Sequence, residues 1–120
     1  MSKEHKTEAL AIHCIDFRFQ DQIQEHLEYV QSLKDFDRIS WPGASKDFDN
    51  VSQAAALSIE LHDPDEAYIY EHEDCGAYGN DNSEETHKEN AEKLKEFLLG
   101  KKPQIKVTTL IATFEGMKAL

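Results

Sequence analysis

Hydrophobic residues of this 120-residue chain fall into two kinds of pattern. Four short segments are apolar, β-branched or aromatic, as is typical of buried strands. They cover residues 9–15, 37–41, 67–70 and 107–112. Between them, apolar residues recur every three or four positions, which predicts amphipathic helices. The three helical stripes run over residues 19–33, 51–61 and 91–98.

The order of these segments is strand, helix, strand, helix, strand, helix, strand. Alternation of this kind predicts an α/β fold with a mainly parallel, four-stranded sheet flanked by helices. We find no repeat, long linker or low-complexity tract. We therefore expect residues 1–120 to form a single domain.

Acidic residues outnumber basic ones 24 to 13, which gives a net charge of −11. Binding of a phosphate backbone needs clustered Lys and Arg, so this charge argues against a nucleic-acid partner. The chain has no apolar run long enough to cross a membrane and no secretion signal. We therefore expect a cytoplasmic protein, in which two cysteines far apart in sequence favour a metal or catalytic site over a disulfide.

Each of the two cysteines lies in a short polar motif that follows a predicted strand. The motifs are Cys-Ile-Asp-Phe-Arg at residues 14–18 and His-Glu-Asp-Cys-Gly at residues 72–76. The carboxyl ends of parallel strands meet at one edge of a sheet, so we expect the two motifs to meet. Cys14, His72 and Cys75 would then bind zinc and leave a fourth position for water, whose pKa the metal lowers to about 7.

Asp16 and Arg18 share a side of an extended segment because they alternate with Phe17. An arginine fork keeps a carboxylate ionised and oriented, so Asp16 could accept a hydrogen bond from a zinc-bound hydroxide. Asp16 could instead rotate, bind the zinc as a fourth ligand and switch the site off. The sequence leaves both states open, together with a purely structural zinc. A thiol redox protein is disfavoured because the cysteines do not form a Cys-x-x-Cys motif.

The ordered pair of motifs resembles the β-class carbonic anhydrases, with this chain as a short, divergent member. The resemblance covers most of residues 9–112. It implies zinc held by Cys14, His72 and Cys75, with Asp16 and Arg18 as a catalytic dyad. It also implies reversible hydration of carbon dioxide to bicarbonate, and a homodimer or higher homo-oligomer whose active-site cleft lies between subunits.

The chain departs from the family pattern at two places that shape the pocket. Phe17 stands where the family usually has a small polar residue. The loop at residues 40–43, Ser-Trp-Pro-Gly, lacks the family's Arg and Asn. Relatives on this scaffold also hydrolyse carbon disulfide or carbonyl sulfide, so those substrates and a non-catalytic zinc-binding role stay as alternatives. Four other histidines are interpreted as surface or helix-face residues rather than ligands: His13, His26, His62 and His87.

Overall fold

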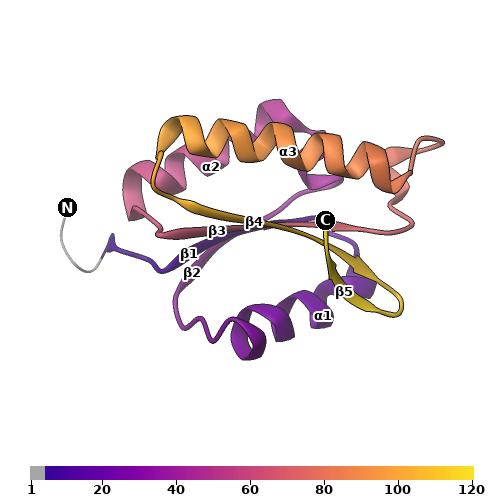
Figure 1. The fold of residues 1–120 in the computed structure, drawn as a ribbon, viewed down its shortest axis with the longest axis horizontal. Helices are drawn as coiled ribbons and strands as arrows, with labels where there is room; N and C mark the ends of the chain where they lie inside the picture. The colour runs from indigo at the N-terminus through magenta and orange to yellow at the C-terminus, as the bar shows by residue number, and fades with distance from the viewer. Residues whose placement is uncertain (1–4) are drawn as a thin grey trace.

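The computed structural model describes residues 5–120, whose centre is a five-stranded sheet (Figure 1). The strand order is β2-β1-β3-β4-β5, and the first four strands are parallel. The strands are β1 (Ala9–His13), β2 (Phe36–Ser40), β3 (Glu66–His72), β4 (Lys106–Thr113) and β5 (Gly116–Ala119). The predicted α/β class with its mainly parallel sheet is therefore confirmed.

Strand β5 is an addition to the four predicted strands. It pairs antiparallel with β4, from Thr113 opposite Gly116 to Leu110 opposite Ala119. Its sequence, Gly-Met-Lys-Ala, contains no β-branched or aromatic residue, so its own strand propensity is low. A tight turn after β4 reverses the chain and places these residues beside β4. The strand therefore forms because of its hydrogen bonds to β4 and not because of its own sequence.

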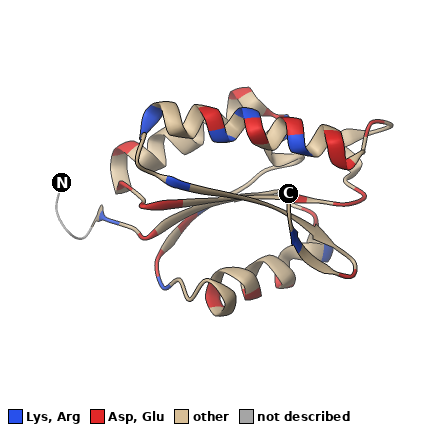
Figure 2. Cartoon of the chain, in the orientation of Figure 1, with Lys and Arg blue, Asp and Glu red and all other residues tan. Residues whose placement is uncertain are grey.

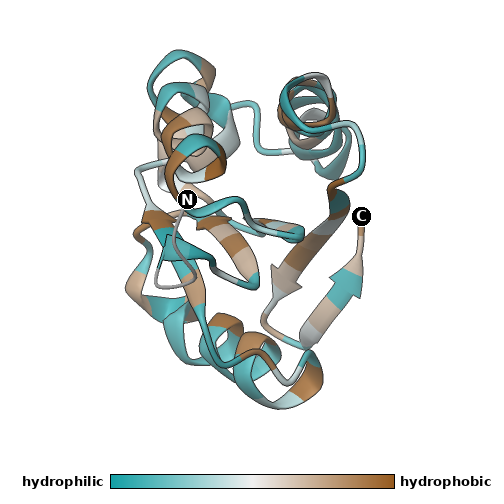
Figure 3. Cartoon of the chain, turned by 90° about the vertical axis from the view of Figure 1, so that its left-hand side faces the viewer, coloured by the Kyte–Doolittle hydropathy of each residue, from teal (hydrophilic) through white to brown (hydrophobic). Residues whose placement is uncertain are grey.

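Helices cover both faces of the sheet (Figure 1). Helices α2 (Phe48–His62) and α3 (Glu84–Lys101) lie on one face, and α1 (Gln20–Glu25) lies on the other. Figure 3 shows the same layers turned by 90°, with hydrophobic residues on the strands and on parts of the helices that cover them. Within residues 5–120, no helix is long and apolar enough to cross a membrane.

The predicted helix over residues 19–33 is interrupted. Helix α1 passes into a π-helical turn, η3 (His26–Val30), in which the amide of Gln31 donates to the carbonyl of His26. The wider turn rotates the following residues relative to a 3.6-residue period. Leu27 stays buried, whereas Val30, on the same predicted stripe, is 64% exposed.

Two hydrophobic clusters lie on opposite faces of the sheet, because successive side chains of a strand alternate. Ile12 and Ile69 pack in the cluster beneath α2 and α3. Tyr68 and Tyr70 pack in the cluster facing α1. By the same alternation, the last two residues of β3 point to opposite faces. Acidic residues are spread over the helices, the loops and some strands, with basic residues interspersed along α3 (Figure 2).

Candidate metal centre

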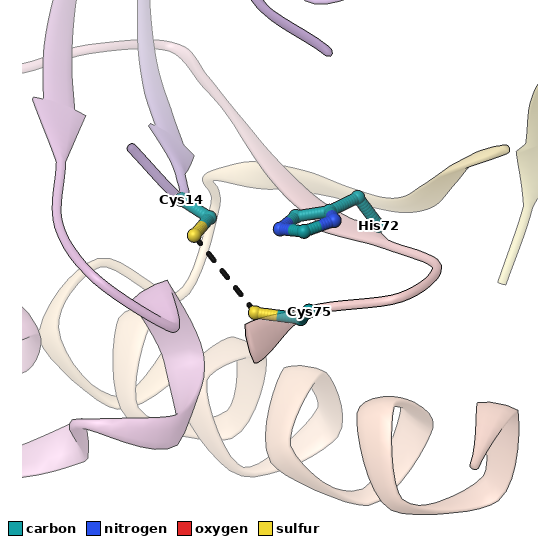
Figure 4. Close-up of side chains that lie close together, drawn as sticks. All are labelled: Cys14, His72 and Cys75. Atoms are coloured by element: carbon teal, nitrogen blue, oxygen red, sulfur yellow. Dashed lines mark hydrogen bonds between the residues drawn. The ribbon is translucent and has the colours of Figure 1, made fainter. Parts of the chain in front are cut away.

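The two cysteine motifs meet at the carboxyl edge of the sheet, as the sequence predicts. Cys14 directly follows β1, His72 is the last residue of β3, and these strands are parallel neighbours. The possible ligand atoms of Cys14, His72 and Cys75 all lie within 4.8 Å of one another, and all three residues are buried. The two sulfurs are 3.9 Å apart, with the imidazole beside them (Figure 4).

The imidazole of His72 presents one free nitrogen to this group. Its Nδ1 donates a hydrogen bond to the carbonyl of Glu73 at 2.8 Å, which leaves Nε2 with the lone pair. Nε2 is buried and has no hydrogen-bond partner within residues 5–120. A buried nitrogen without a partner is costly, and a metal ion at this position would satisfy it. The ring packs against Phe19, with 4.7 Å between the ring centroids.

The sulfurs of Cys14 and Cys75 are hydrogen-bonded to each other and share one proton. A hydrogen bond from Cys75 lowers the pKa of the Cys14 thiol, against the opposing effect of burial. The same hydrogen bond, together with burial, raises the pKa of Cys75. The amide of Gly43 also donates to the sulfur of Cys14 at 3.3 Å. A divalent cation takes the place of such a proton when it binds two thiolates, so the donor set of two sulfurs and one nitrogen fits zinc.

Asp16 is paired with Arg18 rather than turned into the group of three ligand atoms. Arg18 donates to Oδ1 of Asp16 from Nε at 3.0 Å and to Oδ2 from Nη2 at 2.7 Å. The hydrogen bonds from Arg18 lower the pKa of Asp16 to about 2. The carboxylate nevertheless stays close to the ligand group, with Oδ2 4.0 Å from Nε2 of His72. Of the two predicted states of Asp16, the structure therefore has the arginine-paired one.

A second carboxylate, which is not among the predicted site residues, also binds this arginine. Arg18 donates from Nη1 to Oδ2 of Asp74 at 2.9 Å and from Nη2 to the Asp74 carbonyl at 2.8 Å. Asp74 lies within the second motif and has a left-handed φ of 54°. Arg18 thus ties the Cys14 motif directly to the loop that carries Cys75. The only signal in the sequence was the position of Asp74 next to Cys75.

The mouth of the site is apolar on one side and charged on the other. The depression outside the ligand group is lined by Ile15, Phe17 and Gly76 together with Asp16, Arg18 and Asp74. Phe17 is 84% exposed, whereas Phe19 is buried in the core. Trp41 does not line this depression. Its indole N–H donates to Asp47 at 2.8 Å, in the loop that precedes α2.

Three of the four histidines interpreted as surface or helix-face residues are buried: His13, His26 and His87. His13 lies on a strand, where its Nδ1 donates to the carbonyl of Cys14 at 2.8 Å and its Nε2 accepts from Arg38 at 2.7 Å. Hydrogen bonds of this kind allow an imidazole to be buried. Within residues 5–120, the group of possible metal ligands includes only His72 among the histidines.

A family model described as "Putative carbonic anhydrase" matches residues 4–116. The chain belongs to this family. The family resemblance predicted from the two motifs is therefore confirmed.

Two sequence relatives of this family member are uncharacterised proteins from Rickettsia bellii and Rickettsia conorii. Each is 27% identical over an alignment of 141 residues that spans 98% of this chain. The alignments cover 86% of the first relative and 76% of the second.

Two solved structures share the fold at 15% sequence identity. A carbonic anhydrase from Glaciozyma antarctica matches with a TM-score of 0.63, over 92% of this chain and 80% of that one. The apo form of a carbon disulfide hydrolase matches with a TM-score of 0.64, over 96% of this chain and 79% of that one. The fold is therefore that of a β-carbonic anhydrase.

Proposed function

We propose that this chain binds zinc through Cys14, His72 and Cys75 and catalyses the reversible hydration of carbon dioxide. The observation that carries the proposal is the buried, unpaired Nε2 of His72 beside two sulfurs 3.9 Å apart. Two thiolates and one imidazole leave a tetrahedral ion one exchangeable position, which is typical of catalytic zinc. Membership of the carbonic anhydrase family supports the choice of reaction.

The reaction adds water to carbon dioxide and yields bicarbonate and a proton. Zinc, when bound, would supply the Lewis acidity that makes water a nucleophile near neutral pH. Asp16 would accept a hydrogen bond from that nucleophile and so direct its lone pair toward the substrate carbon. Arg18 keeps Asp16 ionised and oriented through its fork, and Asp74 holds the far side of the guanidinium. Asp16 and Arg18 are thus the proposed catalytic dyad.

A second substrate class is favoured by the mouth of the site. Ile15, Phe17 and Phe114 are all exposed large apolar side chains, and Ile15 and Phe17 line the depression outside the ligand group. An apolar approach suits carbon disulfide or carbonyl sulfide, whose hydrolysis needs the same attack on a linear carbon electrophile. The structural likeness to a carbon disulfide hydrolase supports this alternative at the level of the fold.

A homodimer is part of the proposal. Phe17, at 84% exposure, is a large apolar side chain beside the dyad, and burial of such a side chain against another subunit is favourable by about 1.5–3 kcal/mol. A partner there would also exclude water from the mouth of the site. We further propose that residues 1–120 act as one zinc-binding domain.

The test is metal analysis of the purified protein combined with stopped-flow hydration of carbon dioxide. We expect about one zinc per chain, and a hydration rate that is lost in Cys14→Ser and His72→Gln. His62→Gln makes the same change at a histidine outside the ligand group and should keep both metal and rate. Bound zinc with a hydration rate at background would overturn the carbonic anhydrase proposal.

The same preparation separates the alternatives. Hydrolysis of carbon disulfide by zinc-loaded protein that leaves carbon dioxide at background would favour the second substrate class. A non-catalytic role, with Asp16 on the metal, predicts no activity with either substrate. Activity that rises above about pH 8, where hydroxide displaces a carboxylate from zinc, would count against that role.

A further inference from the structure

Glu71, the residue before the ligand His72, is a buried acid that the proposed reaction does not use. It points to the opposite face of β3 from His72, toward α3, and its side chain is only 1% exposed. A carboxyl group buried to this degree is costly unless several donors satisfy it. The hydrogen-bond partners of Glu71 therefore show which segments of the chain this carboxyl group connects.

Three donors from three different segments converge on Glu71. Ser45, in the 3-10 turn η4 (Ala44–Lys46), donates its hydroxyl to Oε2. Tyr78, in the turn η5 (Gly76–Tyr78), donates its hydroxyl to Oε1 at 2.8 Å. His87, on α3, contacts Oε1 through Nδ1 at 2.7 Å. One carboxyl group thus joins the loop after β2, the turn after Cys75 and helix α3.

The contacts continue from His87 to the backbone of Cys75. Nε2 of His87 lies 2.7 Å from the side-chain amide of Asn82. With the amide nitrogen on that side, its oxygen accepts from the backbone N–H of Cys75 at 2.9 Å and of Asp74 at 3.3 Å. This orientation satisfies every partner, and it makes Nε2 of His87 an acceptor, so Nδ1 carries the proton that is donated to Glu71.

The same network reaches the sulfur of Cys14 through the other loop. Ser45 lies two residues after Gly43, whose amide donates to Cys14 at 3.3 Å. The rings of Tyr78 and His87 also stack, with centroids 3.8 Å apart, so the two partners of Glu71 support each other. The segments that contact the Cys14 sulfur and the Cys75 backbone are therefore both hydrogen-bonded to the carboxyl group of Glu71, through Ser45 and His87.

We propose that Glu71 is a positioning residue. With Asn82 and His87, it holds the loop that carries Cys75 and the loop whose Gly43 amide contacts Cys14 in the arrangement that binds metal. The inference rests on the metal binding proposed above, and not on which substrate is used. Hydrogen-bonded partners that orient metal ligands typically change metal affinity 10–100-fold when they are removed. Glu71 would do so by holding the backbone that carries the ligands.

The first test measures zinc affinity by competition with a chromophoric chelator. Glu71→Gln replaces one acceptor oxygen with an NH2 group and removes the negative charge. Either Tyr78 and His87 lose their shared acceptor, or the hydrogen bond with Ser45 must reverse its direction. We expect zinc affinity to fall about 10–100-fold. The matched control is Tyr70→Phe, which removes a buried 2.7 Å contact with His26 on the other face of the same strand. The control should keep zinc affinity within about twofold whatever its effect on stability.

A second pair of variants tests the link to Cys75 if Glu71→Gln does not fold. Asn82→Ala removes both the acceptor for two backbone amides and the donor to His87, whereas Asn82→Asp keeps the acceptor and loses only the donor to His87. We expect Asn82→Ala to lose zinc affinity about tenfold or more and to shift the visible bands of the cobalt-substituted protein. In both measurements Asn82→Asp should lie between Asn82→Ala and wild type, because it keeps the acceptor for the two backbone amides. Unchanged affinity and cobalt spectrum in Asn82→Ala, or in a folded Glu71→Gln, would overturn the inference.

The two proposals fail in different ways. Wild-type protein that binds zinc but hydrates no carbon dioxide would sink the proposed activity, while the affinity and cobalt measurements would still decide the role of Glu71. Wild-type protein that binds no zinc would overturn both.

Discussion

Gly43 lies where a single methyl group would disturb both the fold and the site. Its backbone is left-handed, with φ of 74°, and its amide donates to the sulfur of Cys14. A Cβ at this position would lie 3.1 Å from Cβ of Ala77 and 3.4 Å from Cβ of Lys46. We therefore expect Gly43→Ala to destabilise the protein by two separate effects.

The two effects can be given magnitudes. A left-handed backbone costs an L-residue about 1–2 kcal/mol. The 3.1 Å approach to Ala77 is shorter than an ordinary carbon–carbon contact, and overpacking of this kind costs about 1–3 kcal/mol. Together they lower the free energy of unfolding by about 2–5 kcal/mol, a large part of the roughly 5–15 kcal/mol of a typical domain.

Urea unfolding of the metal-free, reduced protein separates the two effects. In an Ala77→Gly background the partner methyl is absent, so Gly43→Ala should cost about 1–3 kcal/mol less than in wild type. Gly76→Ala, where a new Cβ meets nothing within 4 Å, is the control in the same region. If the double variant is additive within about 0.5 kcal/mol, the contact with Ala77 does not restrict this position.

Two further predictions concern charged groups. The folded-state pKa of Asp16, about 2, lies below its ordinary value near 3.9, so its ion pair stabilises the fold above about pH 4 and loses that effect as the pH falls through about 2. The stability difference between wild type and Asp16→Asn should be constant from about pH 5 to 7 and shrink below about pH 4; growth on acidification would contradict this sign. Lys102 is buried and donates to Oδ1 of Asp63 at 2.8 Å and to the Pro64 carbonyl at 2.6 Å. Lys102→Met should therefore lower the free energy of unfolding by about 2–4 kcal/mol in urea titrations. Equal stability of Lys102→Met and the exposed control Lys106→Met would show that these buried contacts contribute nothing.

Hydrophobic periodicity was sufficient to predict the sheet and its helices, but not their local departures. Strand β5 depends on a hairpin turn after β4, and its residues carry no strand pattern of their own. The π-helical turn at His26–Val30 inserts a residue into a helical period, and a pattern count assumes that the period is constant. Val30 consequently occupies an apolar position in the predicted stripe and an exposed one in the protein.

The grouping of Cys14, His72 and Cys75 could be predicted because parallel strands bring distant motifs to one edge. The hydrogen-bond network around these three residues could not be predicted. Glu71 lies beyond the predicted end of the third strand, at residue 70, and nothing local indicates that Ser45 and His87 converge on it. Asp74 likewise meets Arg18 only through a left-handed turn. A lone acid that continues an apolar strand is the one signal of a buried network that the sequence carried.

The separation of Cys14 and Cys75 along the chain has a consequence for folding. Cys14 and Cys75 are 61 positions apart. They meet only when β1 has paired with β3, its neighbour in the sheet, although β2 and α2 lie between these strands in the sequence. Contacts this distant in sequence are the slow ones to form. An ion that needs both sulfurs would find no complete site in a partly folded chain, so it would bind after the rate-limiting step. Metal would then leave the refolding rate unchanged and slow the unfolding rate.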